Sequence, residues 1–258
     1  VMSPIAMLIA FMTIVIKEIT RFTRIWQQTL VPPAISTLLY FVIFGNLIGP
    51  RIGQMDGFDY MDFLVPGLIL MSVITASYQN VVSSFFGAKW GKSIEELLVS
   101  PTPNLIILLA YICGGVARGV LVGLIVTSVS LLFTDLSIFN GWVLASVVVL
   151  TAILFSLGGF INAVFAKTFD DVSIVPTFVL LPLTYLGGVF YSINLLGDFW
   201  QQVSKANPIL YMINAFRYGF LGITDVSVFF SYGMIIAFIM VFFAISLYLL
   251  SHSRGLRA

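Results

Sequence analysis

The stretch NLIILLAYICGGVARGVLVGLIVTSVSLLF, residues 104–133, decides the fold of this chain. It carries one charged side chain, Arg118, in a sequence that is otherwise made of apolar, small or uncharged residues. A membrane-spanning helix needs about 20 mostly apolar residues, because the hydrocarbon core of a bilayer is about 30 Å thick. The stretch is long enough to meet this requirement, so we predict that it crosses a membrane as a helix.

The rest of the chain repeats this pattern. Of its 258 residues 60% are hydrophobic and 9% are charged, whereas a soluble domain carries about 25% charged residues. The hydropathy is too continuous for a barrel, whose strands alternate over about 10 residues. We therefore predict an all-α membrane protein with a single transmembrane domain, residues 1–258. Its six spans are predicted at about 30–48, 62–86, 104–133, 141–166, 172–192 and 229–250.

Two segments outside these spans are also predicted to be helical. Between Thr13 and Gln28, polar side chains recur every three or four residues opposite an apolar face. This pattern predicts an amphipathic helix at about 5–28 that lies in the cytoplasmic interface; a short first span is the alternative. Residues 193–227 are rich in aromatic side chains and are interrupted by Pro208 and by glycines. We predict one or two short re-entrant helices there, in the outer half of the bilayer.

The distribution of Lys and Arg predicts the orientation, because cytoplasmic loops are enriched in these residues. One set of loops contains Lys17, Arg21, Arg24, Lys89, Lys92, Lys167, Arg254 and Arg257. The opposite set contains only Arg51, Lys205 and Arg217. We therefore expect both termini to lie in the cytoplasm, which is consistent with an even number of spans.

Residues 87–93, GAKWGKS, come close to a phosphate-binding loop. The motif G-x-x-x-x-G-K-[ST] needs a glycine five residues before Gly91, and Phe86 stands there. The preceding residues end a membrane span, so no α/β domain is present to hold a nucleotide. We therefore expect no nucleotide site in this chain.

The same residues begin a short cytoplasmic helix between two spans. After Gly91 the sequence KSIEELLVSP predicts a helix with Ser93 as its N-cap and Glu96 as the second member of a capping box. Pro101 ends it. Its apolar edge consists of Ile94, Leu97 and Leu98. A helix of this kind either transmits the movement of a partner protein to the spans or rests on the lipid surface.

These residues carry a resemblance to a known family. GKSIEELLVSP, residues 91–101, resembles the first cytoplasmic loop of ABC-2-type exporter permeases, in which a glycine precedes Thr or Ser, a Glu-x-Leu-Leu-like run and Ser/Thr-Pro. Residues 175–196 and 207–222 are similar to the last two spans of that family and the outer hairpin between them. The resemblance covers essentially the whole chain. It departs from the family at Lys89 and Trp90, where Arg-Glu is frequent.

The resemblance implies a permease subunit of an ATP-driven exporter in the plasma (inner) membrane. Such a subunit pairs with a second copy of itself and with two copies of a separate cytoplasmic ABC ATPase, which binds ATP and Mg. This chain is then expected to contact lipid but no nucleic acid, and to have no catalytic residue, metal or cofactor of its own. The expected ATPase-contact residues are Lys89, Trp90, Lys92, Ser93, Ile94, Glu95, Glu96, Leu97 and Leu98.

Arg118, Asn162 and Tyr185 are the candidates for the transport path. A charge inside a bilayer costs at least about 2.5 kcal/mol on insertion scales, so Arg118 is expected to face protein or water. Its candidate partners are backbone carbonyls, Asn162, Asp170 and Asp171. It either attracts an anion in the path or makes a structural contact. Tyr185 belongs either to an interfacial aromatic belt or to an exit for an amphipathic substrate.

Gly115, Gly119 and Gly123 recur every fourth residue, which lets another helix approach closely. We read this row first as packing within the chain and second as a contact between copies. Pro182, Gly187 and Gly188 predict a kink in the fifth span.

Two other functions compete with the permease. A secondary transporter driven by an ion gradient would normally show carboxylates near the middle of the bilayer, and the Asp and Glu residues here fall at or beyond the ends of the spans. An intramembrane enzyme would need a constellation of catalytic residues. The only histidine, His252, lies in the polar tail, and Cys113 is the only cysteine.

Overall fold

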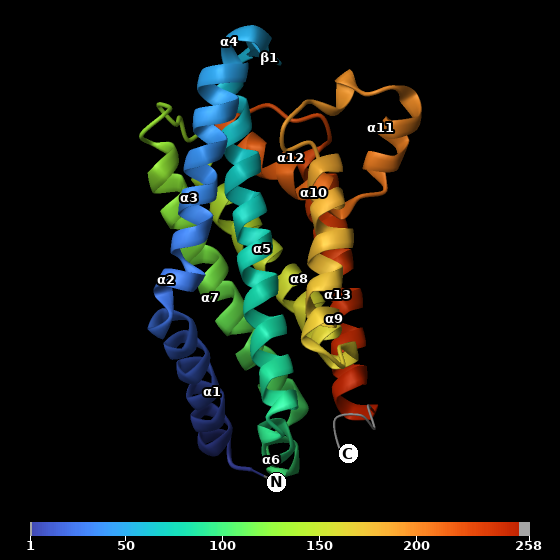
Figure 1. Cartoon of the computed structure of the whole chain (residues 1–258). Helices are drawn as coiled ribbons and strands as arrows, with labels where there is room; N and C mark the ends of the chain where they lie inside the picture. The colour runs from blue at the N-terminus through green and yellow to red at the C-terminus, as the bar shows by residue number, and fades with distance from the viewer. Residues whose placement is uncertain (1, 253–258) are drawn as a thin grey trace.

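The computed structural model describes residues 2–252 as a bundle of helices (Figure 1). Six helices within this range are long and apolar enough to cross a membrane, which confirms the predicted all-α fold. They comprise Trp26–Ile52, Tyr60–Trp90, Asn104–Ser130, Gly141–Phe165, Phe169–Leu186 and Val228–His252. Arg254 and Arg257, which contribute to the predicted orientation, lie outside the described residues.

Three unbroken helices form the centre of the bundle: α5 (Tyr60–Trp90), α7 (Asn104–Ser130) and α8 (Gly141–Phe165). Each packs against the other two. Glycines of α7 permit this approach, because neighbouring side chains lie where a Cβ atom would be. Gly115 faces Ser156 of α8, Gly119 faces Ser77 of α5, and Gly123 also faces α5. The glycine row therefore packs helices of a single chain against one another.

The first and fifth spans are interrupted, in contrast to the central three. The first consists of α2 (Trp26–Thr29), α3 (Val31–Tyr40), a π-helical segment η1 (Phe41–Ile48) and α4 (Gly49–Ile52). The fifth consists of α9 (Phe169–Val175), a π-helical segment η2 (Pro176–Leu180) and α10 (Leu181–Leu186). The two spans lie on either side of α5 in Figure 1. The sixth span, α13 (Val228–His252), is regular and packs against α8 and α12.

The prediction of a kink at Pro182, Gly187 and Gly188 is wrong in its position. The irregular turn begins at Pro176, six residues earlier, where the helix widens to π geometry. Gly187 and Gly188 do not bend the span but end it, because the helix stops at Leu186 and Gly188 takes a φ of 80°. A φ in this range suits glycine, which has no Cβ atom to clash with the backbone.

Short elements cap one end of the bundle. They are a hairpin of β1 (Gln54–Met55) and β2 (Phe58–Asp59), the turn η3 (Ile193–Leu195), α11 (Asp198–Lys205) and α12 (Pro208–Leu221). The predicted short helices of residues 193–227 are thus present. Asn207 caps α12 by accepting a hydrogen bond from the backbone N–H of Ile209, and Gly222 ends it in the left-handed conformation. Helix α12 packs among α5, α8 and α13, and most of its side chains are buried.

The N-terminal helix α1 (Pro4–Arg24) begins at Ser3, whose hydroxyl accepts a hydrogen bond from the N–H of Ala6. It runs beside α7 at the end of the bundle opposite α11 (Figure 1). One face carries exposed apolar side chains, among them Ile5, Leu8 and Ile9. The helix is therefore docked on the protein and presents an apolar outer face, as expected beside lipid. Its location in the cytoplasmic interface stays a prediction.

Candidate functional site

A short helix, α6 (Ser93–Val99), lies at the end of the bundle opposite α11 and β1 (Figure 1). It connects α5 to α7 in the chain. The predicted capping box at Ser93 and Glu96 is wrong, because the N-cap is Lys92 and no side chain caps the helix. Lys92 adopts a left-handed backbone with φ of 58°. The Ser93 hydroxyl, already inside the helix, donates instead to the carbonyl oxygen of Ala88 at 3.3 Å.

The residues of α6 divide between the bundle and the surface. Ile94 is buried, and Leu97 and Leu98 pack against the hydrophobic core. These three predicted contact residues therefore hold the helix in place. The exposed residues of the loop and helix are Trp90, Lys92, Ser93, Glu96 and Val99, with Glu95 half-buried. The outward edge is thus a mixture of charged and apolar side chains around one large aromatic ring.

Lys89, at the end of α5, joins this end of the bundle to the end of α8. Its ammonium group donates to the carbonyl oxygens of Val164 at 2.6 Å and Ala166 at 2.9 Å, at the C-terminus of α8. A cation at this position complements the helix dipole and satisfies carbonyls that have no partner within the helix. The end of α5 and the end of α8 are therefore tied together beside α6.

Aromatic contacts continue the same junction into the fifth span. The ring of Phe169, the first residue of α9, lies 5.3 Å from that of Trp90 and 5.0 Å from that of Phe86, centroid to centroid. Helix α9 itself begins with a capping box, in which Asp171 accepts from the N–H of Thr168 and the Thr168 hydroxyl accepts from the N–H of Asp171. The end of α5, from which the chain continues into α6, is thus in contact with the first residue of α9.

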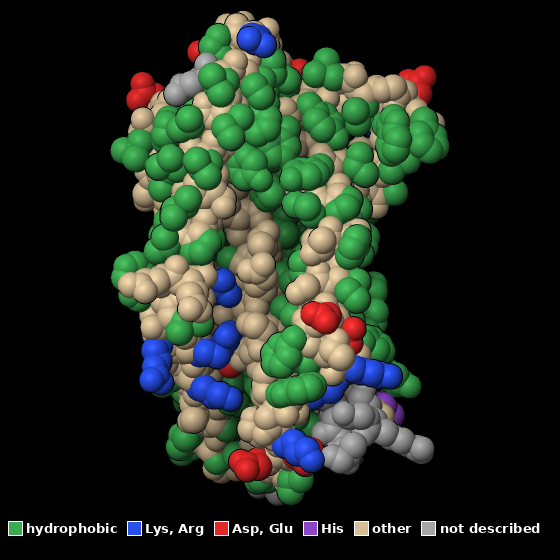
Figure 2. Space-filling view, viewed as in Figure 1, with side chains coloured by type: hydrophobic (Ala, Val, Ile, Leu, Met, Phe, Trp, Pro, Cys, Tyr) green, Lys and Arg blue, Asp and Glu red, His purple; other side chains and the backbone are tan. Residues whose placement is uncertain are grey.

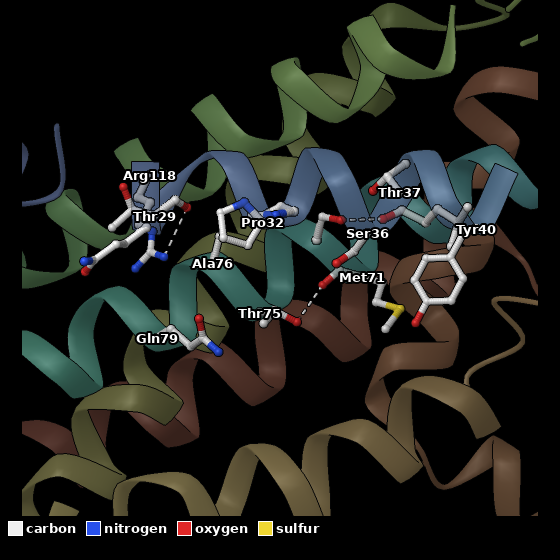
Figure 3. A pocket seen from close by; sticks show the side chains of 14 residues that line it. Thr29, Pro32, Ser36, Thr37, Tyr40, Met71, Thr75, Ala76, Gln79 and Arg118 are labelled. Atoms are coloured by element: carbon white, nitrogen blue, oxygen red, sulfur yellow. Dashed lines mark hydrogen bonds between the residues drawn. The ribbon is translucent and has the colours of Figure 1, made fainter. Parts of the chain in front are cut away.

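A cavity of about 250 Å³ lies between α3 and α5. In Figure 3, Thr75, Ala76 and Gln79 of α5 face Pro32, Ser36 and Thr37 of the first span across it. Figure 2 shows the corresponding surface as a tan band in the middle of the visible face. Lys and Arg side chains lie beside its lower part, and apolar patches flank its upper part. Hydroxyl and amide groups line much of this groove, which is unusual for a surface at bilayer depth.

Arg118 of α7 lies at one end of this cavity (Figure 3). Its Nη2 donates to the carbonyl oxygen of Thr29 at 3.3 Å, so its partner is one of the predicted kinds, a backbone carbonyl. The other predicted partners are elsewhere. The Asn162 amide donates to the carbonyl of Val172 at 3.2 Å, joining α8 to α9, and Asp171 caps α9.

Tyr185 belongs to an aromatic cluster toward the other end of the groove. The ring centroid of Phe190 lies 5.8 Å from that of Tyr40, 5.1 Å from that of Phe44 and 5.6 Å from that of Tyr185. Tyr40 also lines the cavity that holds Arg118. Two of the three predicted path residues, Arg118 and Tyr185, therefore lie near opposite ends of one groove, whereas Asn162 lies outside it.

A buried polar cluster joins α1 to the centre of the bundle. Glu18 is fully buried; its Oε1 accepts from the Ser84 hydroxyl at 2.6 Å, and its Oε2 lies 3.5 Å from Nη2 of Arg21. The same nitrogen of Arg21 donates to the carbonyl and side-chain oxygens of Asn80. Sequence analysis missed this cluster. The signal was available, because Glu18 stands in an i, i+4 row with the apolar residues Ile14 and Phe22.

Arg217 is a second residue whose burial was missed. It falls within the predicted short helices of residues 193–227, and in the structure it belongs to α12 and is 2% exposed. Its Nη2 donates to the carbonyl of Gly188 at 2.7 Å, and its guanidinium lies 3.7 Å from the centre of the Phe63 ring. Arg217 thus connects α12, α5 and the end of the fifth span.

Within residues 2–252, no group of three or more His, Cys, Asp or Glu side chains is arranged to hold a metal ion.

Comparisons with known proteins agree with this architecture. The family model described as "ABC-2 type transporter" matches residues 9–221. The chain is 59% identical to the inner membrane transport permease YadH of Escherichia coli (strain K12) over 97% of its own length and 98% of that protein. It is also 23% identical to nodulation protein J of Rhizobium leguminosarum bv. viciae, over 87% of its length and 89% of that protein. From the family match, which covers most of the chain, and from its likeness to YadH, we conclude that the chain belongs to the ABC-2 type transporter family.

Proposed function

We propose that this chain is the membrane-spanning permease subunit of an ATP-driven exporter in the inner membrane. Two copies form the translocation path, and two copies of a separate cytoplasmic ABC ATPase supply the energy. The inner-membrane location is supported by the likeness to the inner membrane transport permease YadH of E. coli. The chain acts as one transmembrane domain and carries no catalytic residue; its contribution is motion.

The observation that carries this proposal is the arrangement of α6. A helix of seven residues is anchored by Ile94 and follows directly on the end of α5, where Lys89 contacts α8 and Trp90 contacts the fifth span. Its outward edge leaves an aromatic ring and opposite charges exposed, and large aromatic residues are frequent in the energetic centres of interfaces. A partner that pushes on this edge therefore moves the ends of three helices together.

Charge supports a cytoplasmic position for α6. In Figure 2 most Lys and Arg side chains visible on this face lie in the half of the molecule that contains α6. The described ends of the chain, at the start of α1 and the end of α13, are also at the α6 end (Figure 1). By the positive-inside rule this end is cytoplasmic, where an ABC ATPase is available.

The pairing of two copies is supported by a difference in hydropathy among three poorly buried spans. The sixth span, α13, has a mean hydropathy of 2.6, whereas the fifth has 1.3 and the first 1.7. Lipid suits α13. The first and fifth spans lie on either side of α5 and flank a groove lined with hydroxyl and amide groups. A second copy facing this groove would remove both spans from lipid and enclose a path between the copies.

The ATPase contact can be tested by reversing charges on the exposed edge of α6. We expect Lys92→Glu with Glu96→Lys to reduce co-purification of the ATPase about 10-fold or more and to abolish stimulated ATP hydrolysis. The candidate ATPase is sought among neighbouring genes whose products contain a complete phosphate-binding loop. Lys205→Glu, a charge reversal on α11 at the opposite end, is the matched control. Equal losses in both variants, or no loss in either, would refute the contact at α6.

Sidedness can be measured with single cysteines, because Cys113 is the only native one. In a Cys113→Ala background, an impermeant maleimide added outside intact cells should label Gln201→Cys on α11 and leave Ser93→Cys unlabelled. The reverse pattern would place α6 outside the cell and exclude the proposed ATPase contact.

The interface between copies is testable in the same background. Cysteines placed in turn at Ile174, Phe178 and Leu181 of the fifth span sample its exposed surface. We expect at least one of them to form a disulfide-linked dimer in membranes on oxidation, and Met240→Cys, equally exposed on α13, to form none. Cross-linking through α13 alone would contradict the proposed face.

A further inference from the structure

Arg118 is buried but weakly bound by the rest of the chain. Its side chain is 7% exposed. A guanidinium has five N–H donors, yet within residues 2–252 it makes one hydrogen bond, to Thr29 at 3.3 Å, and its Nε has no partner. The group lines the cavity between α3 and α5 (Figure 3). Arg118 therefore has unused donor capacity at the wall of a cavity.

No carboxylate neutralises this charge within the described residues. The one ion pair found there joins Arg21 to Glu18, and it leaves Arg118 without an acidic partner within 4.0 Å. None of the residues that line the cavity is Asp or Glu. Buried charges are normally paired, because an uncompensated one is costly in a medium of low dielectric. The cavity is thus electrostatically suited to an anion.

The chemistry of the cavity changes along its length. Arg118 has the amide side chains of Gln28 and Gln79 as companions in the lining, which can donate further hydrogen bonds to an oxyanion. Leu68, Met71 and Tyr40 add apolar and aromatic surface to the same cavity. An occupant that satisfies both parts has an anionic head and an apolar body.

Size restricts what can enter. Sites that enclose a drug-sized molecule have volumes of about 300–1,000 Å³, and this cavity has about 250 Å³. It therefore accommodates one head group and the first part of a chain. The remainder of the molecule would lie in the groove along α5 that Figure 2 shows.

We propose that the Arg118 cavity binds the anionic head group, a phosphate, sulfate or carboxylate, of an amphiphile. Arg118 holds the oxyanion through the donors that the protein leaves unused, and the apolar end of the cavity receives the start of the chain. That this amphiphile is the transported cargo rests on the proposed function; that the cavity binds it does not.

Binding is tested on the purified permease alone, in neutral detergent micelles, with ³²P-labelled dodecyl phosphate as the probe. Protein-free micelles give the background. Hydrogen bonds to charged groups are strong enough that removing the guanidinium should weaken binding about 10- to 100-fold. We expect this loss for Arg118→Gln and a smaller one for Arg118→Lys, which keeps the charge but not the planar donor fork.

Arg24→Gln is the matched control, because it removes the same charge from an exposed position on α1; it should bind normally. If Arg118→Gln does not fold, the unaltered chain still decides the matter, because unlabelled dodecyl phosphate must displace the probe at least 10-fold better than dodecyl sulfobetaine, which has no net charge. Equal displacement, or equal affinity in Arg118→Gln and Arg24→Gln, overturns the proposal. Labelled inorganic phosphate that binds as tightly as dodecyl phosphate would overturn the assignment to an amphiphile.

A second measurement separates this inference from the proposed function. In the complex with its ATPase, dodecyl phosphate should stimulate ATP hydrolysis in the unaltered chain and not in Arg118→Gln. Binding to the isolated permease without any ATPase association would refute the proposed function and leave the anion site intact. ATPase association without Arg118-dependent binding would do the opposite.

Discussion

Arg217 and Arg118 are both almost completely buried, but they lie in regions that treat a buried charge in opposite ways. At the end of the bundle that contains α11, Arg217 is held by the Gly188 carbonyl at 2.7 Å and by the face of the Phe63 ring at 3.7 Å. Beside the groove, Arg118 has a single hydrogen bond at 3.3 Å and a cavity in front of it. Within residues 2–252 each guanidinium makes one hydrogen bond and leaves its Nε without a partner, so neither burial nor the number of bonded donors separates the two. The difference is that Arg217 has the shorter hydrogen bond and an aromatic ring against its guanidinium, and Arg118 has neither.

We expect the largest loss of stability from a substitution at Arg217. Arg217→Ala removes a charged hydrogen bond, worth about 1.5–3 kcal/mol, and a desolvated cation–π contact of about 2 kcal/mol. We expect the free energy of unfolding to fall by about 3–5 kcal/mol, measured by unfolding in mixed micelles with increasing sodium dodecyl sulfate. Arg217→Lys should recover part of this loss. A change in the free energy of unfolding below about 1 kcal/mol would show that Arg217 does not have this structural role.

Glu18 supplies an intermediate case, a buried charge that is fully partnered but at the edge of the bundle. Glu18→Ala leaves the Ser84 hydroxyl and Arg21 without their acceptor, so we expect a loss of about 2–3 kcal/mol in the same unfolding assay. Glu96→Ala, an exposed glutamate on α6, should change stability by less than about 0.5 kcal/mol. Proteolysis of α1 should accelerate in the first variant only, since Glu18 holds this helix against α5.

Substitution of Lys89 tests whether a cation with two hydrogen bonds contributes mainly to coupling with the ATPase and less to stability. Lys89→Met keeps the length of the side chain but loses both hydrogen bonds to the end of α8. We expect a stability loss of about 1–2 kcal/mol together with a larger loss of ATPase stimulation by cargo. Lys92→Met, an exposed lysine three residues later, should leave stability unchanged. If Lys89→Met lowers the free energy of unfolding as much as Arg217→Ala, Lys89 stabilises the fold and has no separate role in coupling.

The smallest stability effect is expected at Arg118. Arg118→Gln removes one long hydrogen bond and also the cost of burying a charge, so the free energy of unfolding should change by less than about 1 kcal/mol, in either direction. The same unfolding assay measures it beside Arg217→Ala. A loss of 3 kcal/mol or more at Arg118 would show that the two arginines are alike and would break the comparison.

The spans could be predicted because lipid places the same demand on each of them, whatever its neighbours. Residues 104–133 already satisfy the length and polarity that a bilayer requires, and α7 begins at Asn104 as expected. The carbonyl partner of Arg118 was likewise among the predicted kinds, because a charge inside a helical span has few other partners. Requirements that are local or set by the solvent can be read from one segment.

Features that depend on a second segment were out of reach or misplaced. The burial of Arg217 could not be predicted, because nothing in its own sequence shows that Phe63 and Gly188, far away in the chain, lie on either side of it. The start of α6 was misplaced by one residue, because Ser93 and Glu96 fit a capping box while the chain leaving α5 puts Lys92 in the left-handed region. Tertiary contacts decide the burial of Arg217, and the path of the chain out of α5 overrides the local capping preference at α6.

The two π-helical segments have a mechanical consequence. A π turn holds one residue more than an α turn. If that residue is drawn out of the turn, everything beyond it advances by one position, which in an α-helix means a rotation of about 100° and a translation of about 1.5 Å. The segments η1 and η2 belong to the two spans on opposite sides of α5. Each span can therefore rotate and advance along its own axis without breaking its helix. Such a step presents a new row of side chains to the space between the two spans.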